Sequence, residues 1–141
     1  MLSATSEYAL RALIRMSQVP EGAAILGRDL ADEARIPQNY LAKILLALRH
    51  AGIVTAHRGT GGGYGLSKRP EEIRLLDVVE LFDGTQSRPR CLLGEHERCS
   101  EDTPCAAHES YRALREAHMR FLETTTIARI GRASGKEKAE S

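Results

Sequence analysis

Residues 36–67 read IPQNYLAKILLALRHAGIVTAHRGTGGGYGLS. In this stretch Leu41, Ile44, Leu45 and Leu48 recur at the spacing of a helix that buries one face. The period then changes, because β-branched IVTAH is followed by a glycine-rich turn and by YGLS, the pattern of a β-hairpin. A helix followed directly by a hairpin predicts the second half of a winged helix-turn-helix.

The preceding residues predict the first half of the same motif. Residues 3–19 have helical periodicity, and Ser3 or Ser6 can cap the helix. Residues 27–35 predict a short second helix, and Pro37 suits the first position of a third helix that runs to about residue 50. Two short helices joined by a tight turn are the helix-turn-helix pattern.

The remaining residues predict two more helices separated by a long loop. Residues 74–83 are amphipathic, whereas residues 84–104 have no periodicity. Residues 106–130 predict the longest helix, whose apolar stripe needs a second copy of the chain to cover it. The stripe comprises Tyr111, Leu114, His118, Phe121, Thr125 and Ala128.

The expected fold is mainly α with a small β-hairpin, and 141 residues suffice for one ordinary domain with an appendage. We expect a winged helix-turn-helix domain over residues 1–70 and a loop with a dimerisation helix over 71–130. A disordered tail over 131–141 would follow. The chain lacks a run of eighteen apolar residues and a secretion leader, so we expect a cytoplasmic protein without a membrane partner.

Charge is distributed unevenly along the chain. Residues 1–70 hold nine basic and five acidic residues, a local charge of +4, although the whole chain carries only +1. Residues 71–130 hold eight basic and twelve acidic residues, a local charge of −4. The basic half could face DNA phosphates, and ordinary solvated surface charge is the alternative.

Polar residues at the start of the third helix and at the hairpin tip are candidate contacts to double-stranded DNA. Gln and Asn can bond adenine edges, Tyr and Lys more often contact phosphate, and an Arg at a hairpin tip suits the minor groove. Each side chain taken alone could equally be solvated, the glycines could serve the turn alone, and a winged helix could bind protein instead. The candidates are Arg28, Gln38, Asn39, Tyr40, Lys43, His57, Arg58, Gly59, Gly61, Gly62 and Tyr64.

All three cysteines fall within one short segment, as Cys91-x7-Cys99-x5-Cys105-x2-His108. An odd group of cysteines in a cytosolic chain predicts metal or redox chemistry rather than a disulfide framework. Thiolates suit iron–sulfur clusters, Zn and Cu(I), and these gaps are wider than those of a zinc knuckle. Candidate fourth ligands are His108 and, if the chain ends meet across a dimer, Glu7. Three reduced thiols, a zinc site, a surface His108 and a Glu7 that serves only the helix dipole remain open.

An enzyme is not expected from this sequence. It shows no pairing of a nucleophile with a base and no carboxylate dyad. The glycines of GTGGGYG lie in a hairpin rather than between a strand and a helix, so they do not indicate a nucleotide site.

Three stretches resemble the Rrf2-type transcription regulators, a family that includes IscR, NsrR and RirA. They are SEYALRALIRM, residues 36–80 with the wing HRGTGGGYGLSKRP, and the cysteine segment with its following helix, about residues 1–130 in all. The resemblance implies a homodimeric repressor that binds a DNA operator and carries a 2Fe-2S or 4Fe-4S cluster at Cys91, Cys99 and Cys105. The state of that cluster would report iron, nitric oxide or redox conditions.

The members of the family differ in their ligands. His108 matches the fourth ligand of IscR-like proteins, Glu7 matches the acidic ligand that NsrR-like proteins take from the other subunit, and the x7 and x5 gaps are those of RirA-like proteins. Ala42 stands where IscR has an acidic residue in the recognition helix, so the operator of IscR is not carried over. A Zn or thiol/disulfide switch and a winged-helix protein-interaction adaptor are the competing hypotheses.

Overall fold

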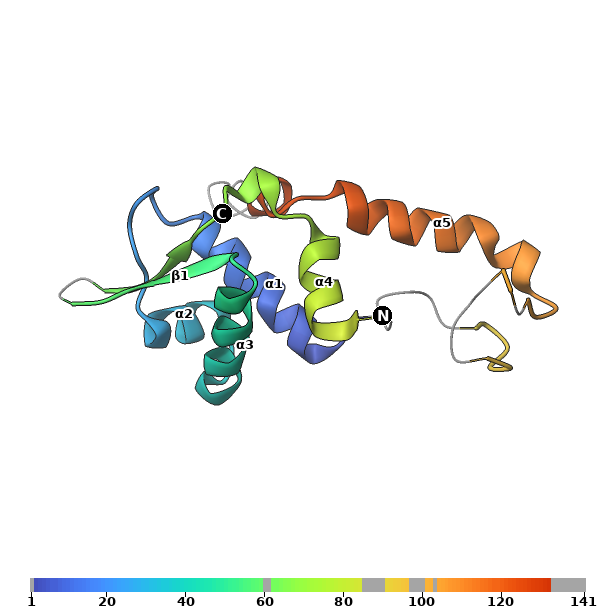
Figure 1. The fold of residues 1–141 in the computed structure, drawn as a ribbon, viewed down its shortest axis with the longest axis horizontal. Helices are drawn as coiled ribbons and strands as arrows, with labels where there is room; N and C mark the ends of the chain where they lie inside the picture. Colours follow the sequence, from blue (N-terminus) through green and yellow to red (C-terminus); the bar gives the residue numbers. More distant parts are fainter. Residues whose placement is uncertain (1, 60–61, 85–90, 97–100, 103, 133–141) are drawn as a thin grey trace, which may run out of the picture.

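The computed structural model of the chain describes residues 2–59, 62–84, 91–96, 101–102 and 104–132. It is mainly helical with a two-stranded antiparallel sheet, as the sequence predicts (Figure 1). Within these residues no helix combines the length and the apolar character that crossing a membrane requires. The elements in chain order are α1 (Ala4–Ser17), α2 (Gly27–Ala34), α3 (Gln38–His50), β1 (Val54–His57), β2 (Gly63–Leu66), a 3-10 turn (Pro70–Glu72), α4 (Leu75–Asp83) and α5 (His108–Thr124).

The helix α1 begins where the sequence predicts, and the structure distinguishes the two cap candidates. The Ser3 side chain accepts a hydrogen bond from the Ser6 backbone N–H at 3.1 Å, so Ser3 is the N-cap. Ser6 lies inside the helix and is fully buried. The buried face of α1 also includes Ala12 and Leu13, which are 0% exposed and make this helix the centre of the core.

The turn between α2 and α3 is tight because Arg35 adopts the left-handed conformation, with φ of 56°. The Ile36 N–H then returns to the Ala31 carbonyl at 2.9 Å. Pro37 is extended, with ψ of 134°, and caps α3 from outside, so its predicted placement as the first helical residue is wrong by one position. Its ring still fixes φ at −57°, which favours the entry into the helix.

The hairpin pairs β1 with β2 in the register Val54 with Leu66 and His57 with Gly63. Backbone hydrogen bonds of 3.0 Å and 2.8 Å between Ile25 and Tyr64 also attach β2 to the segment before α2. Gly63 is required there, because its φ is +137° and an added Cβ would lie 2.3 Å from the Ile25 oxygen. The wing is therefore fastened to the helix-turn-helix by backbone as well as by packing.

One apolar core joins parts of the chain that the sequence assigns to two regions. It runs from Ala9 in α1 to Val78 and Val79 in α4 and on to Leu122 and Ile127. The helix α4 thus packs with α1 inside the winged domain.

The prediction of one helix over residues 106–130 is wrong. α5 ends at Thr124, Thr125 is extended, and the chain is helical again over residues 127–132, which includes two residues predicted as tail. The break has a long-range cause: the Leu75 N–H donates to the Thr125 oxygen and the Ile127 N–H donates to the Ile73 oxygen, both at 2.9 Å. Three consecutive β-branched threonines favour the extended conformation at that point.

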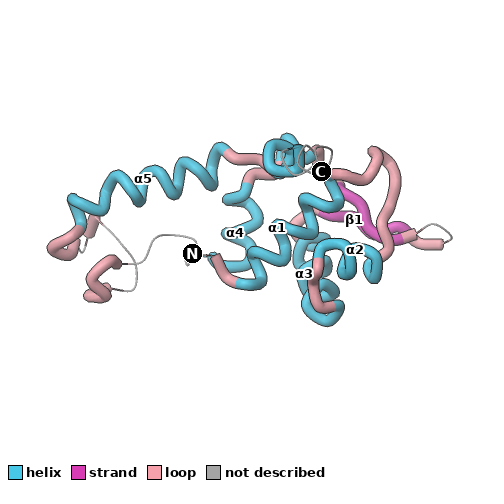
Figure 2. Tube along the Cα trace, turned by 180° about the vertical axis from the view of Figure 1, so that it is seen from behind, coloured by secondary structure: helices cyan, strands magenta, loops and turns pink. Residues whose placement is uncertain are grey.

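Most of α5 projects beyond the winged domain, as both ribbon views show (Figures 1 and 2). Only His108 and Leu122 are buried along its length. The described residues of the cysteine segment lie at its far end, next to its N-terminus (Figure 1).

Candidate functional site

The start of α3 places its predicted DNA-contacting residues on the accessible side of the helix. The opposite side is buried, as Leu41 and Leu48 illustrate at 2% and 0% exposure. Their contact with DNA stays a prediction, but the structure presents all of them together. The exposed residues are Gln38, Asn39, Tyr40 and Lys43.

The wing tip exposes His57, Arg58 and Gly59. Gly59 has φ of +92°, and its carbonyl accepts the Gly62 N–H at 2.9 Å. An added Cβ on Gly62 would lie 2.6 Å from the His57 oxygen, so the turn itself requires this glycine. Gly61 lies outside the described residues.

The other two candidates occupy different environments. Arg28 is exposed in the first turn of α2. Tyr64 is half-buried and packs against the core, with its ring 3.5 Å from where a side chain on Gly27 would begin. Its ring therefore holds the wing to the start of α2, and a contact to DNA stays a prediction.

Two residues of α1 that were not candidates also reach this surface. The ring of Tyr8 lies 5.9 Å from the ring of Tyr40 at an interplanar angle of 55°. The Arg11 guanidinium carbon lies 4.9 Å from the centre of the Tyr8 ring. Tyr8 and Arg11 are three residues apart, so their proximity on one helix face was available from sequence, whereas the contact with α3 was not.

Two of the three cysteines lie near each other in the described residues. Cys91 is buried, and the nearby Cys105 side chain is among the groups that lower the pKa of Cys91. The backbone N–H groups of His96, Leu93 and Glu95 act on that pKa in the same direction. Together these groups, of which the His96 N–H has the largest effect, lower the pKa of Cys91 against the opposing effect of burial. Cys99 lies outside the described residues.

The cysteine sulfurs and the backbone N–H groups near Cys91 are the kinds of group found in a metal–thiolate centre. Amide N–H groups that converge on a sulfur stabilise a thiolate, the form in which cysteine binds metal. Both described cysteines are free thiols. The cysteine part of the predicted ligand set is therefore compatible with an iron–sulfur cluster.

His108 is 3% exposed and turns toward the cysteine segment, as predicted, but it meets a carboxylate there. Its Nε2 lies 3.2 Å from an oxygen of Glu101. Arg112 and Arg115 lie 3.6 Å and 3.8 Å from the same carboxylate. Among the residues that the structure describes, a ring nitrogen of His108 and carboxylate oxygens of Glu101 and Glu109 all lie within 4.8 Å of one another, and the two cysteines are not part of this group. The two arginines make this an ion-pair cluster, not a cation site.

Glu7 does not reach the cysteine segment of its own chain. It is exposed on α1, within the winged domain, whereas the described residues of the cysteine segment lie at the far end of α5 (Figure 1). If Glu7 is a ligand, it must come from a second subunit.

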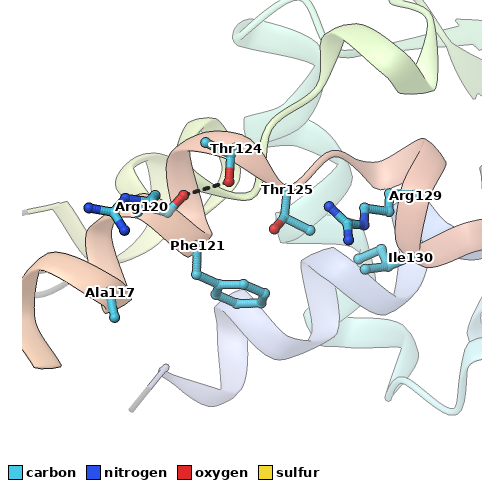
Figure 3. A pocket seen from close by; sticks show the side chains of 7 residues that line it. All are labelled: Ala117, Arg120, Phe121, Thr124, Thr125, Arg129 and Ile130. Atoms are coloured by element: carbon cyan, nitrogen blue, oxygen red, sulfur yellow. Dashed lines mark hydrogen bonds between the residues drawn. The ribbon is translucent and has the colours of Figure 1, made fainter.

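A shallow depression of about 410 Å³ lies where α5 ends and the chain turns into residues 127–132 (Figure 3). Phe121, 52% exposed, and Ile130 form its apolar part, with Arg120 and Arg129 beside them. One heptad earlier on α5, Leu114 is 58% exposed. This helix thus carries an apolar stripe that the described residues of its own chain leave uncovered.

Comparison with known proteins gives a consistent result. The model of the Rrf2 family, described as iron-dependent transcriptional regulators, matches residues 2–133. An HTH-type transcriptional regulator of Aquifex aeolicus is 33% identical over 129 residues, which are 90% of this chain and 88% of that protein. The regulator IscR of Aliivibrio salmonicida is 27% identical over 92% of this chain and 76% of its own length.

A solved structure supports the same assignment. CymR, the global cysteine regulator of B. subtilis, superposes with a TM-score of 0.78 at 25% identity, covering 94% of this chain and 97% of that chain. These relatives are transcriptional regulators rather than enzymes. The winged helix and the expected absence of an enzyme activity are thereby confirmed.

Proposed function

Because the chain belongs to the Rrf2 family of transcriptional regulators, we propose that it is a homodimeric repressor whose operator binding is controlled by an iron–sulfur cluster. The proposal rests chiefly on one observation: Cys91 and Cys105 lie near each other in a segment apart from the winged domain. This separation supports a division of sensing and DNA binding between different parts of one small protein. A regulator with reduced thiols acts in the cytoplasm.

The cluster, 2Fe-2S or 4Fe-4S, is held by Cys91, Cys99 and Cys105. It supplies a centre whose presence and charge depend on iron, nitric oxide and redox conditions. For a fourth ligand the chain offers two residues. His108 must leave Glu101 to serve, whereas Glu7 must come from the partner subunit.

The proposed DNA interface is the exposed end of α3 together with the wing tip. Gln38 and Asn39 read base edges, while Arg58 enters the minor groove. Tyr40 and Lys43 contact phosphates and fix the register of the helix in the groove. The uncovered Leu114 and Phe121 of α5 form the contact between subunits.

Coupling between the two sites runs through α4, the last element before the cysteine segment. α4 packs on α1, and α1 packs on α2 and α3. Holding or releasing the segment that follows α4 shifts this helix set relative to the partner. Since two recognition helices must fit half-sites about one DNA turn apart, a small shift lowers specific affinity strongly.

The test is a titration of a labelled operator with protein that has or lacks its cluster. The operator is selected from random duplexes with the anaerobically purified protein. We expect a steep fall of affinity with salt for both forms, as phosphate contacts require, and a difference between them in operator affinity but not in random-duplex affinity. Equal operator affinities of the two forms would exclude cluster control, and no duplex binding would favour a protein-interaction adaptor.

A thiol/disulfide switch is the second candidate, because Cys91 and Cys105 are free thiols that lie near each other. Similarity to a cysteine regulator, CymR, also favours a thiol/disulfide switch. In this case the two thiols lose two protons and two electrons to hydrogen peroxide, which becomes two water molecules, and a disulfide forms. Thiol counting before and after peroxide, with metal analysis for iron and for Zn, distinguishes an iron–sulfur cluster, a Zn site and a thiol/disulfide switch.

A further inference from the structure

We propose that Arg11 of α1 contacts a DNA phosphate and that Tyr8 positions it there. The inference rests on the proposed DNA-binding function. It extends the interface from the recognition helix to a helix that the candidate residues do not include. Two contacts carry it: the Arg11 guanidinium lies over the Tyr8 ring, and the Tyr8 ring lies tilted against the ring of Tyr40.

These two contacts connect Arg11 to the proposed DNA-facing surface. The Arg11 guanidinium lies 4.9 Å from the Tyr8 ring centre, and that ring lies 5.9 Å from the ring of Tyr40. Tyr40 is 49% exposed near the start of α3. Arg11 is exposed as well, so its charge stands at the same surface as the predicted contacts.

Tyr8 is suited to hold the position because it is fixed on one side. It is half-buried and packs against the core. A guanidinium over an aromatic face is attracted to it, and a cation–π contact leaves most of its N–H donors available for phosphate oxygens. The contact therefore limits the motion of Arg11 without neutralising it.

The charge of Arg11 is unpaired, unlike that of the next arginine on the same helix. Arg15 is tied to Glu33 at 2.5 Å. In the described part of the chain no carboxylate lies within ion-pair distance of Arg11, and this includes Glu7, which is one turn earlier. An unpaired, ordered arginine beside a recognition helix is the type of group that binds phosphate.

The position of Lys43 agrees with this assignment. Lys43 is exposed one helical turn after Tyr40. Tyr40 and Lys43 are three residues apart, so they lie on the same side of α3, and Arg11 and Lys43 are exposed cations on two different helices. A DNA backbone that crosses the start of α3 would meet both, so Arg11 and Lys43 would fix the docking angle of α3 together.

The test measures the salt dependence of DNA binding by the full-length protein. The probe is a fluorescein-labelled random-sequence duplex of about three helical turns. Loss of one phosphate contact lowers the slope of log K against log salt by about 0.9, so Arg11→Ala should lose about 3.5-fold more affinity at about 50 mM than at about 200 mM salt. Arg49→Ala is the matched control, since Arg49 is an exposed arginine at the opposite end of α3. We expect its slope to match that of the wild type.

Variants of Tyr8 test the positioning role separately. Tyr8→Phe keeps the ring and should keep the wild-type slope, whereas Tyr8→Leu should reproduce the slope of Arg11→Ala. If Arg11→Ala loses its fold in a thermal melt, Arg11→Gln, which keeps most of the side chain, replaces it. A wild-type slope for the Arg11 variants, or equal effects of Arg11→Ala and Arg49→Ala, would overturn the inference. Absence of binding by the wild type would instead contradict the DNA-binding function itself.

Discussion

The backbone N–H and the hydroxyl of Ser3 both donate hydrogen bonds to the carboxylate of Asp83, 80 residues later in the chain. Ser3 is also the N-cap of α1, and Asp83 is the last residue of α4. The beginning of α1 and the end of α4 are thus joined at one point, directly before the segment that leads to Cys91. We therefore expect a change in that segment to act on the helix that supports α2 and α3.

Removing the hydroxyl of Ser3 should destabilise the protein. Ser3→Ala loses the cap of α1 and the hydroxyl's hydrogen bond to Asp83, while the backbone N–H still donates to that carboxylate, so we expect the free energy of unfolding to fall by about 1–2 kcal/mol. Ser3→Asn, which keeps a capping oxygen and gains a donor for Asp83, should lose less than half of that. Urea unfolding measures the stability of both variants, and equal stability of Ser3→Ala and wild type would show that the Ser3 hydroxyl contributes nothing to it.

The capping box of α4 makes stability depend on pH. Burial raises the pKa of Asp77, but the hydrogen bonds and charge of Arg74 outweigh it and hold that pKa below its usual value. A depressed folded-state pKa stabilises the fold fully above the unfolded value of about 3.9 and loses this contribution as pH falls through the folded value. Asp77→Ala should therefore be less stable than wild type at neutral pH, with a difference that narrows below about pH 4.

The control for this prediction is Glu71→Ala. Glu71 is an exposed partner of the exposed Arg69 at 3.6 Å, and such pairs contribute little. Urea unfolding over a pH series provides the measurement. A gap between Asp77→Ala and wild type that stays constant into acid would refute the assignment.

The wing depends on a glycine at its junction with the segment before α2. In Gly63→Ala the new Cβ meets the Ile25 oxygen, so the paired backbone must separate and the N–H of Tyr64 should exchange with solvent faster. At Gly59, φ is also positive but the space around the glycine is open, so Gly59→Ala should suffer only backbone strain, of about 1–3 kcal/mol at most. Hydrogen exchange at Tyr64 compares them, and equal protection in both variants would contradict the packing described here.

The exposed stripe of α5 should control the oligomeric state. Phe121→Glu places a charge in the proposed contact between subunits and should convert a dimer into a monomer. Leu81→Glu changes a similarly exposed apolar residue of α4, at 41% exposure, and should leave the dimer intact. Light scattering coupled to size exclusion distinguishes the two. A dimeric Phe121→Glu would place the interface elsewhere.

Variants of the cysteine segment separate sensing from folding. Cys99→Ala should abolish cluster binding, seen as loss of visible absorbance, and leave a folded dimer. His108→Ala should alter the spectrum if His108 is the fourth ligand, and an unchanged spectrum would favour Glu7, water or another small ligand. Loss of the dimer in Cys99→Ala would contradict the separation of the two roles.

The winged helix could be predicted because its signals are local. The buried leucines of α3 repeat at helical spacing, and the glycine turn lies between two β-branched or aromatic runs. The end of α5 could not be predicted in the same way. The apolar repeat continues past Thr125, whereas the break depends on pairing with Ile73 and Leu75, about fifty residues earlier.

The candidate site shows the same limit. The residue types at the start of α3 and in the cysteine segment pointed to their chemistry. The contact of Tyr8 with Tyr40 depends on how α1 packs against α3, and no pattern of nearby residues in the sequence predicts that packing. His108 turns toward the cysteine segment as its spacing predicts, but its Nε2 lies beside the carboxylate of Glu101 there.

The most direct test of iron–sulfur cluster binding is native mass spectrometry, with an absorbance spectrum, of the anaerobically purified protein after incubation with iron and sulfide. We predict a coloured dimer whose excess mass corresponds to one iron–sulfur cluster for each subunit, and an apo dimer for Cys99→Ala. A colourless protein at the apo mass, or one that carries only Zn, would show that the protein does not bind an iron–sulfur cluster.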